Sequence, residues 1–366
     1  MNPFPENIPN VSGVSSPALL FYPDRIQRNI DRMIDIAGNV SRLRPHIKTH
    51  KSREIVRMQV ISGIHKFKCA TLAEVELLGL EKVNDVVLAI QPIGPDISRF
   101  VALAKCFGDT TFSVVVDNAS VVHQLNACCE AEGTRLGVFL DLNVGMDRTG
   151  IKPGMEALAR YRLLHEMPYL DVSGLHIYDG HIHDSNLAHR TDRVEDCWTV
   201  AANFIGLLER MGFAPPVLIA GGSPSFPIHA KRPGLELSPG TTLLWDLNGV
   251  DGLKDLPFEC AAFLLTRVVS KPAPGLVCFD LGHKAVAAEM PHPRVRFQGL
   301  EDADFVSQSE EHLVVETDQW ESIRVGDTYI GIPRHVCPTV ALYDHVHVVE
   351  DDQISGTWEV AARHRL

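Results

Sequence analysis

Two lysines and two histidines stand close together near the start of the chain, in the stretch RPHIKTHK at residues 44–51. A lysine amine that has lost its proton can form a Schiff base with a carbonyl compound. Lys48 is better placed for this chemistry than Lys51, which lies a turn further toward the helix that we expect to follow. A solvated surface charge is the alternative role, and the stretch alone does not decide between the two.

A glycine-rich stretch, AGGSPS at 220–225, follows an apolar run and could open toward a helix. Backbone N–H groups in such a loop converge on an anion, and loops near the end of a barrel often bind phosphate in this way. A plain tight turn is the alternative. A phosphate site together with a lysine at a strand end suggests pyridoxal phosphate, because that cofactor needs both an amine and a phosphate cradle.

A third candidate site is the stretch PRHVCPT at 333–339, where His335 and Cys337 stand two residues apart. Alternate residues of a strand point to the same face, so this imidazole and this thiolate could bind one metal ion. Such a donor pair favours zinc, and two protein ligands would leave positions open for substrate. A buried cysteine beside an exposed histidine is the alternative reading of the same two residues.

Two further polar clusters, LNVGMDRTG at 142–150 and YDGHIH at 178–183, also follow apolar runs. The runs are typical of strands, and the segments between them have helical periodicity, which indicates a parallel sheet covered on both faces. Eight such units predict an α/β fold of the (β/α)8 barrel type, whose active sites lie at the carboxyl ends of the strands. We expect the strands at 42–47, 66–70, 85–90, 111–116, 136–142, 171–178, 216–222 and 241–246.

The pattern changes after Leu247, where strand-like runs are broken by glycine, proline and charge and helical periodicity is weak. We therefore predict a barrel domain over 23–247 and a second, all-β domain over 248–366 that carries His335 and Cys337. A strand at 16–22, within the N-terminal segment 1–22, is expected to join the second domain.

Charge and composition exclude several classes of partner. The chain of 366 residues has 34 basic and 46 acidic side chains and a net charge of −12, which argues against a nucleic-acid partner. No apolar run is long enough to span a membrane, and no signal peptide is visible, so we expect a cytoplasmic protein without a membrane partner. The eight cysteines follow no regular framework and are expected to be reduced.

Taken together, these stretches resemble the motifs of the D-threonine aldolase and D-serine dehydratase family, over nearly the whole chain. RPHIKTHK is similar to the family's cofactor-lysine motif, which implies that Lys48 holds pyridoxal phosphate with His46 beside it. NVGMDRTG and GLHIYDGH resemble elements that imply cofactor contacts for Arg148 and Tyr178. AGGSPS matches the phosphate cradle and PRHVCPT the metal motif. The residues implied for the cradle are Gly221, Gly222 and Ser223, and those implied for the metal are His335 and Cys337.

The resemblance implies an alanine racemase-like fold, a homodimer, and a small β-hydroxy D-amino acid as substrate. Two departures from the aldolase pattern bear on the reaction. His-x-Cys replaces the harder His-x-Asp pair, so Zn2+ is expected rather than Mn2+ or Mg2+. The residue after Tyr178 is Asp179 where aldolases tend to carry histidine, and His181 and His183 follow shortly after.

We expect retro-aldol cleavage to glycine and an aldehyde, with His181, assisted by Asp179 or His183, as the catalytic base. The alternative is β-elimination to a keto acid and ammonia, in which Lys48 removes the α-proton. Two further alternatives are an amino-acid racemase, with Tyr329 or Tyr343 as the second acid, and a non-catalytic carrier of pyridoxal phosphate. The second domain with its metal motif counts against a carrier, because such carriers are typically a single barrel.

Overall fold

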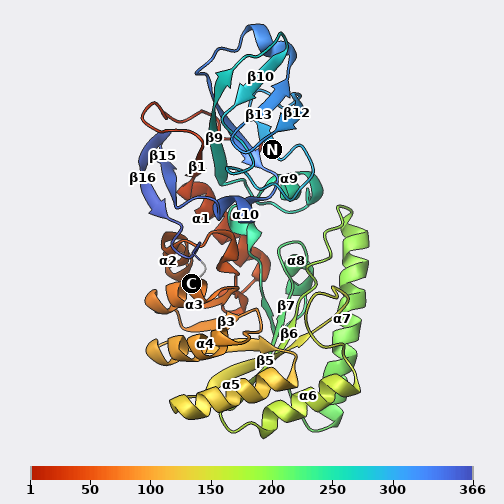
Figure 1. Ribbon diagram of the computed structural model, residues 1–366. Helices are drawn as coiled ribbons and strands as arrows, with labels where there is room; N and C mark the ends of the chain where they lie inside the picture. The colour runs from red at the N-terminus through yellow and green to blue at the C-terminus, as the bar shows by residue number, and fades with distance from the viewer. Residues whose placement is uncertain (1, 365–366) are drawn as a thin grey trace. The chain divides into compact units, whose positions relative to one another are not determined.

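The computed structural model describes residues 2–364, which form two compact units (Figure 1). One, the barrel unit, is made of Met33–Lys48 and Val56–Gly240. The other, the sheet unit, is made of the described residues up to Arg32, together with Thr49–Ile55 and Thr241–Arg363. Each unit contains one main sheet, and each is described by itself below.

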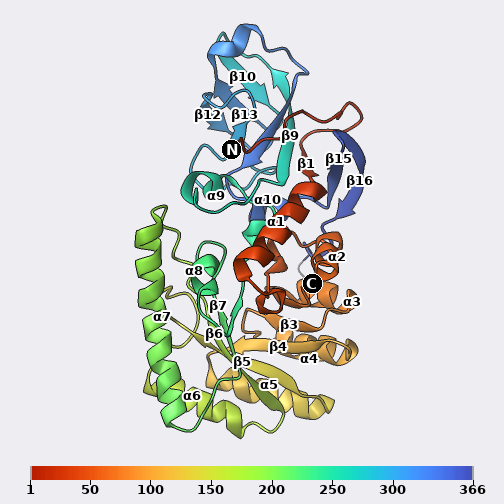
Figure 2. The ribbon, with the colours of Figure 1, turned by 180° about the vertical axis from the view of Figure 1, so that it is seen from behind.

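The barrel unit contains seven parallel strands, and each strand pairs with the next one along the chain. Helices lie outside these strands in both views of the molecule (Figures 1 and 2). Apolar residues therefore occupy both faces of the strands, as in the buried cluster of Val87, Val115, Phe139 and Ile219. The strands are β2 (Lys66–Cys69), β3 (Asp85–Leu88), β4 (Thr111–Val116), β5 (Leu136–Leu142), β6 (Leu170–Ile177), β7 (Val217–Ala220) and β8 (Leu235–Leu237).

The helices of this part of the chain alternate with the strands. They are α3 (Leu72–Leu80), α4 (Pro95–Cys106), α5 (Ala119–Glu132), α6 (Met155–Glu166), α7 (Leu187–Arg210) and α8 (Phe226–Ala230). Before β2 come α1 (Pro23–Ala37), α2 (Arg53–Ile61) and the 3₁₀ turns η1 (Val40–Arg42) and η2 (Ile47–Thr49). Local signals set several ends: Thr71 caps α3 by accepting the Glu74 N–H group, and the Glu74 carboxylate accepts the N–H group of Ala70.

The barrel closes through an irregular segment at 43–46 in place of a regular strand. Leu43 forms a parallel bridge with Leu237 of β8, and His46 forms one with Lys68 of β2. The Arg44 N–H group donates to the Leu237 carbonyl at 2.8 Å, so the segment is bonded to both ends of the seven-stranded sheet.

The side chain of Arg44 strengthens this closure. It is 1% exposed, and its guanidinium donates two hydrogen bonds of 2.7 Å to Asp85 of β3 and one of 2.6 Å to Glu236 of β8. Glu236 also pairs with Lys66 at the start of β2. A planar guanidinium with several donors suits two carboxylates at once, so one side chain joins the segment to two strands.

The sheet unit is a mostly antiparallel sheet in the order β12-β13-β10-β9-β1-β15-β16, with β14 pairing with β9 and β11. The N-terminal strand β1 pairs with β9 antiparallel and with β15 parallel. The strands are β1 (Ala18–Phe21), β9 (Ala262–Ser270), β10 (Leu276–Phe279), β11 (Val295–Phe297), β12 (Asp304–Gln308), β13 (Leu313–Glu316), β14 (Thr328–Pro333), β15 (His345–Glu350) and β16 (Gln353–Glu359). Its short helical pieces are η3 (Thr241–Leu243), α9 (Leu247–Gly252), η4 (Asp318–Glu321) and α10 (Val336–Val340).

The predicted fold class is confirmed, but two of the eight predicted barrel strands are wrong. Residues 42–47 form single bridges between turns, because the segment changes its partner from β8 to β2 within four residues. Residues 241–246 form η3 and the N-cap of α9. The last strand of the barrel is instead the three-residue β8. The domain bounds at 23–247 and 248–366 remain a prediction.

Within residues 2–364, no helix is both long and apolar enough to cross a bilayer.

The Arg44 network yields a stability prediction. Replacing Arg44 with leucine leaves Asp85 and Glu236 without their buried partner, so the barrel should lose roughly 3–5 kcal/mol of unfolding free energy. The matched control is Arg57→Leu, because Arg57 pairs with Glu81 with a side chain that is 58% exposed, and such pairs contribute about 0–1 kcal/mol. Urea unfolding of both variants measures the difference. Equal, small losses would contradict the role of Arg44.

Candidate active site

A cavity of about 400 Å³ lies at the carboxyl ends of the first barrel strands. Small and apolar residues, including Ala70, Ala89 and Val116, form part of its wall. Its polar lining residues are His46, Lys48, Gln91, Asp117, Asp141, Arg148 and Thr149. A mostly apolar hollow with a few convergent polar groups is typical of a small-molecule site.

Lys48 stands in η2, directly after the segment that closes the barrel. Its side chain lies in the wall of this cavity, and the ring of His46 fixes the backbone there, because His46 Nδ1 accepts the N–H group of Lys48 at 3.1 Å. His46 is itself held by the bond from its N–H group to the Pro239 carbonyl. The amine is therefore presented from a turn that is anchored through His46.

Three polar residues lie inside the barrel next to this cavity. Asp141 of β5 and His176 of β6 are partners in the strand register, and Asp141 Oδ1 lies 2.7 Å from His176 Nδ1. His176 Nε2 lies 3.4 Å from the amine of Lys68 on β2. Burial lowers the pKa of His176, and the charge of Lys68 lowers it further, so the ring stays neutral and donates its Nδ1 proton to the Asp141 carboxylate.

Tyr178 lies just beyond β6, and two basic side chains lie near its ring. The Arg148 guanidinium carbon lies 5.1 Å from the centre of the ring and the Lys68 amine lies 5.2 Å from it. Glycines make room for the ring: a Cβ atom at Gly180 would lie 2.2 Å from the Tyr178 ring, and one at Gly222 would lie 3.1 Å from it. The expected cofactor contacts Arg148 and Tyr178 thus lie together, next to the glycine loop.

Asp179 is buried behind this loop, and both of its carboxylate oxygens are bonded. Ser225 Oγ donates to Asp179 Oδ1 at 2.6 Å and accepts the N–H group of Gly222 at 3.0 Å, while His229 Nε2 lies 2.8 Å from Asp179 Oδ2. Burial alone would raise the pKa of Asp179, but the bonds from His229 and Ser225 lower it below its usual value. This geometry favours a role for Asp179 in holding the loop over a role in proton transfer.

The loop glycines have the conformations that this arrangement needs. Gly221 has φ +80°, which side chains rarely adopt, and a Cβ atom there would lie 3.0 Å from the His229 ring. Ser223 Oγ accepts the N–H group of Gly240, which ties the loop to the chain after β8.

The two histidines expected near the cofactor lie in different surroundings. His181 is half-buried, and its Nε2 lies 3.8 Å from Cys197 Sγ of α7. Its Nδ1 is buried and has no hydrogen-bond partner within residues 2–364. His183 is exposed. His181 is thus the more enclosed of the two rings.

In the sheet unit, His335 and Cys337 interact directly, and Glu289 Oε1 lies 2.6 Å from His335 Nδ1. Burial lowers the pKa of His335, but Cys337 and Glu289 more than offset this effect and raise it to about 9. Cys337 Sγ also lies 3.2 Å from Thr49 Oγ1. The segment is an N-cap and a short helix, α10, rather than the expected strand.

The imidazole of His335 and the thiol of Cys337 have donor atoms suited to a metal ion. A carboxylate on one ring nitrogen is the usual partner of a metal-binding histidine and leaves the other nitrogen for the ion. Asp246 Oδ2 accepts the N–H group of Val336, which stands between the two proposed ligands and is thereby fixed. No group of three or more His, Cys, Asp or Glu side chains in residues 2–364 forms a metal cluster, so further ligands would come from water or substrate.

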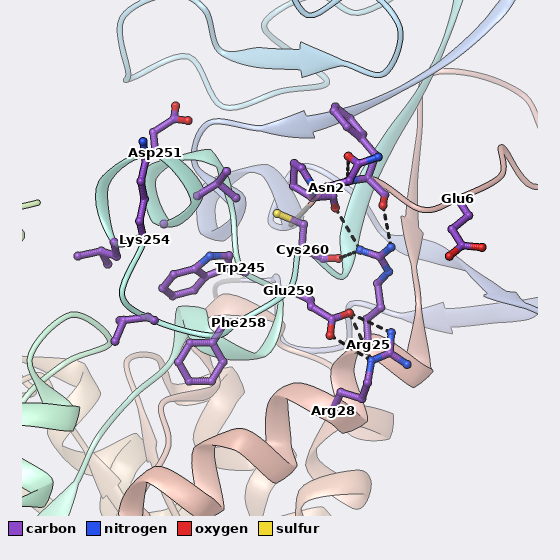
Figure 3. A pocket seen from close by; sticks show the side chains of 16 residues that line it. Asn2, Glu6, Arg25, Arg28, Trp245, Asp251, Lys254, Phe258, Glu259 and Cys260 are labelled. Atoms are coloured by element: carbon purple, nitrogen blue, oxygen red, sulfur yellow. Dashed lines mark hydrogen bonds and ion pairs between the residues drawn. The ribbon is translucent and has the colours of Figure 1, made fainter.

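A cavity of about 780 Å³ in the sheet unit is a weaker candidate (Figure 3). Three of its charged groups, Arg25, Arg28 and Glu259, are already bonded to one another or to the backbone. The terminal nitrogens of Arg25 donate to the carbonyls of Pro3, Phe4 and Cys260, and Arg28 pairs with Glu259. This cavity has the larger volume, but the side chains that could do chemistry line the cavity beside Lys48.

Sequence patterns did not identify four polar residues of this region, which are Lys68, Asp141, His176 and Ser225. A signal was present for the first three, since each is a polar residue inside a run that otherwise reads as a strand buried on both faces. For Ser225 there was none, because serine is common in any turn.

The contacts of Ser225 give a second prediction. Ser225→Ala removes a buried hydroxyl that bonds both Asp179 and Gly222, and should cost about 1–3 kcal/mol of stability. The control is Ser98→Ala on α4, whose exposed hydroxyl donates only to the Pro95 carbonyl and should matter little. Thermal unfolding of both proteins without cofactor is the measurement. Unchanged stability in Ser225→Ala would mean that the loop is held by other contacts.

Comparisons with known proteins agree with this arrangement. The alanine racemase N-terminal domain matches residues 22–246, and a serine dehydratase domain matches residues 261–349. The chain is 29% identical to a D-threonine aldolase from Arthrobacter sp. over 331 residues, 88% of this chain and 85% of that protein. It is 27% identical to a 3-hydroxy-D-aspartate aldolase from Paracoccus denitrificans over 365 residues, 96% of this chain and 93% of that one.

A crystal structure of D-threonine aldolase from Filomicrobium marinum superposes with a TM-score of 0.87 at 25% identity, covering 100% of this chain and 99% of the other. The first domain match alone spans more than half of the sequence. The chain therefore belongs to the alanine racemase N-terminal domain family of pyridoxal-phosphate-dependent enzymes, with a serine dehydratase-type domain after the barrel.

Proposed function

We propose that this enzyme is a pyridoxal-phosphate- and metal-dependent lyase that cleaves a β-hydroxy D-amino acid into glycine and an aldehyde. The observation that carries the proposal is the place of Lys48, in the wall of a cavity of about 400 Å³ at the carboxyl ends of the barrel strands. The names of the aldolases from Arthrobacter and Paracoccus support the substrate class and the reaction.

The residues of the cavity fit the cofactor. Pyridoxal phosphate, when bound, supplies a ring that accepts the electron pair released at the α-carbon of an amino acid. Lys48 provides the amine that holds its aldehyde. Arg148 and Tyr178 lie where they can orient the ring, and the loop of Gly221, Gly222 and Ser223 is the phosphate cradle.

A divalent metal, when bound by His335 and Cys337, supplies Lewis acidity that lowers the pKa of a hydroxyl group. His181 is the proposed base that removes the proton of the β-hydroxyl, because its Nδ1 is buried without a partner among residues 2–364. As that proton leaves, the Cα–Cβ bond breaks and the β-carbon becomes the carbonyl of the aldehyde. A proton then returns to the α-carbon, and glycine is the second product.

The second candidate is β-elimination, favoured by the serine dehydratase-type domain and by the thiolate in the metal pair. In this reaction Lys48 would take the α-proton and hydroxide would leave from the β-carbon, so that a keto acid and ammonia result. The two reactions use the same binding residues and differ in the group that acts as base.

The products decide between the two reactions. Purified enzyme with pyridoxal phosphate and Zn2+ should convert D-threonine to glycine and acetaldehyde, scored by chromatography and by an aldehyde assay. His181→Ala should lower aldehyde release by at least about 100-fold, the usual contribution of general base catalysis, while cofactor binding is retained. The exposed His183→Ala is the control. Release of 2-oxobutanoate and ammonia without glycine would replace cleavage by elimination.

Lys48 should carry the cofactor. The purified enzyme is expected to be yellow, to lose its absorption on borohydride treatment, and to yield a single labelled peptide that contains Lys48. Lys284→Ala is the control, since Lys284 is an exposed lysine paired with Glu310 and Glu311. A label on Lys51 or Lys284 would refute the assignment.

The metal should be required for turnover but not for binding of the cofactor. Chelation, or Cys337→Ala, is expected to abolish product formation and leave the yellow colour, and metal analysis should give one zinc per chain. Cys128→Ala is the matched control, because Cys128 is another half-buried thiol. Full activity of metal-free Cys337→Ala would rule out a catalytic ion at this pair.

A further inference from the structure

Lys68 is a buried lysine that the proposed chemistry does not use. Its side chain stands on β2 between Phe67 and Cys69, and the residue is only 2% exposed. Its amine reaches His176 on β6, although three strands separate β2 from β6 in the sheet. The side chain therefore crosses the interior of the barrel, where apolar residues would ordinarily pack.

Packing and pairing do not explain this lysine. No carboxylate in residues 2–364 forms an ion pair with it, and its hydrogen bond to His176 is long, at 3.4 Å. Buried charged groups are costly unless they are paired, so a methionine of similar length would serve the fold better.

The surroundings of Lys68 are those of the cofactor site. Asp141 and Arg148, which line the cavity beside Lys48, also line a small hollow together with His176 and Tyr178. The Lys68 amine bonds the first of these rings and lies over the face of the second. Lys68 thus lies directly behind groups that the cofactor is expected to contact.

We propose that Lys68 is a positioning residue of the cofactor site: its amine holds the rings of His176 and Tyr178, and the proton that it gains or loses changes the charge behind the cavity. This inference rests on the proposed function, because it assigns the cofactor to the cavity beside Lys48.

The surroundings of Lys68 bring its change of charge near neutral pH. The pKa of Lys68 falls to about 7, first because of burial and then because of the charge of Lys48. The other groups that face the amine are Asp141, Asp179, Arg148, His176 and Tyr178. In the protein without cofactor, below this pH a third positive charge joins those of Lys48 and Arg148, and above it the Lys68 amine is neutral.

The first test needs no cofactor. An amine with a lowered pKa destabilises the fold most when both folded and unfolded chains are protonated, and the cost shrinks as pH rises from about 7 toward the usual lysine value. Lys68→Met should therefore melt above the wild-type protein at pH 6–7, and this gap should narrow toward pH 9. Lys66→Met, on the same strand but partly exposed and paired with Glu236, should show no such narrowing. A gap for Lys68→Met that is constant with pH would overturn the proposal.

The second test reads the cofactor spectrum. In the wild-type enzyme the yellow band should change with pH, with an inflection that marks the protonation of Lys68. Lys68→Met should lose this inflection and keep the high-pH spectrum, and Lys68→Arg, always charged, should keep the low-pH spectrum. An unchanged inflection in both variants would overturn the proposal. If the wild-type protein instead failed to bind pyridoxal phosphate at all, the proposed function would fail, and the melting series would still report whether Lys68 titrates.

Discussion

The barrel closes without a regular strand at its seam, and the site depends on how this closure is made. The segment at 43–46 makes isolated bridges in place of a continuous ladder, and side chains add to the joint. Arg44 does so from a fully buried position, with Asp85 on one side and Glu236 on the other. Because Lys48 follows within one turn, the same network that closes the barrel fixes where the amine emerges.

A second constraint is the polar layer inside the barrel. Asp141, His176 and Lys68 occupy positions on three strands that apolar side chains usually fill, and they are buried. The Asp141–His176 pair is short and in register, so its cost is largely offset. Lys68 is only weakly bonded, so the free-energy cost of burying its amine is not offset in this way. Proteins retain unfavourable buried groups mainly at functional sites, where groups with perturbed pKa values gather.

Sequence patterns predicted the architecture because parallel strands buried on both faces leave continuous apolar runs. They failed at the seam, where residues 42–47 alternate polar and apolar side chains as a strand does but divide their pairing between β8 and β2. They also missed β8, since three residues between prolines and glycines give no periodicity. The motifs located Lys48, Arg148 and Tyr178 together, whereas Lys68 could not be placed, because the direction of a side chain across a barrel depends on distant strands.

The choice between cleavage and elimination comes down to which base reaches the substrate. In either proposed reaction a metal held by His335 and Cys337 would act on the β-hydroxyl, so the softness of these donors would affect which metal binds more than which bond breaks. Elimination needs a base at the α-proton, and Lys48 is the residue proposed for this role. Cleavage needs a base at the hydroxyl. Asp179 is committed to Ser225 and His229, and His183 is exposed, which leaves His181 with its unpartnered Nδ1 among the described residues of this stretch. The proposal of cleavage over elimination therefore rests on His181.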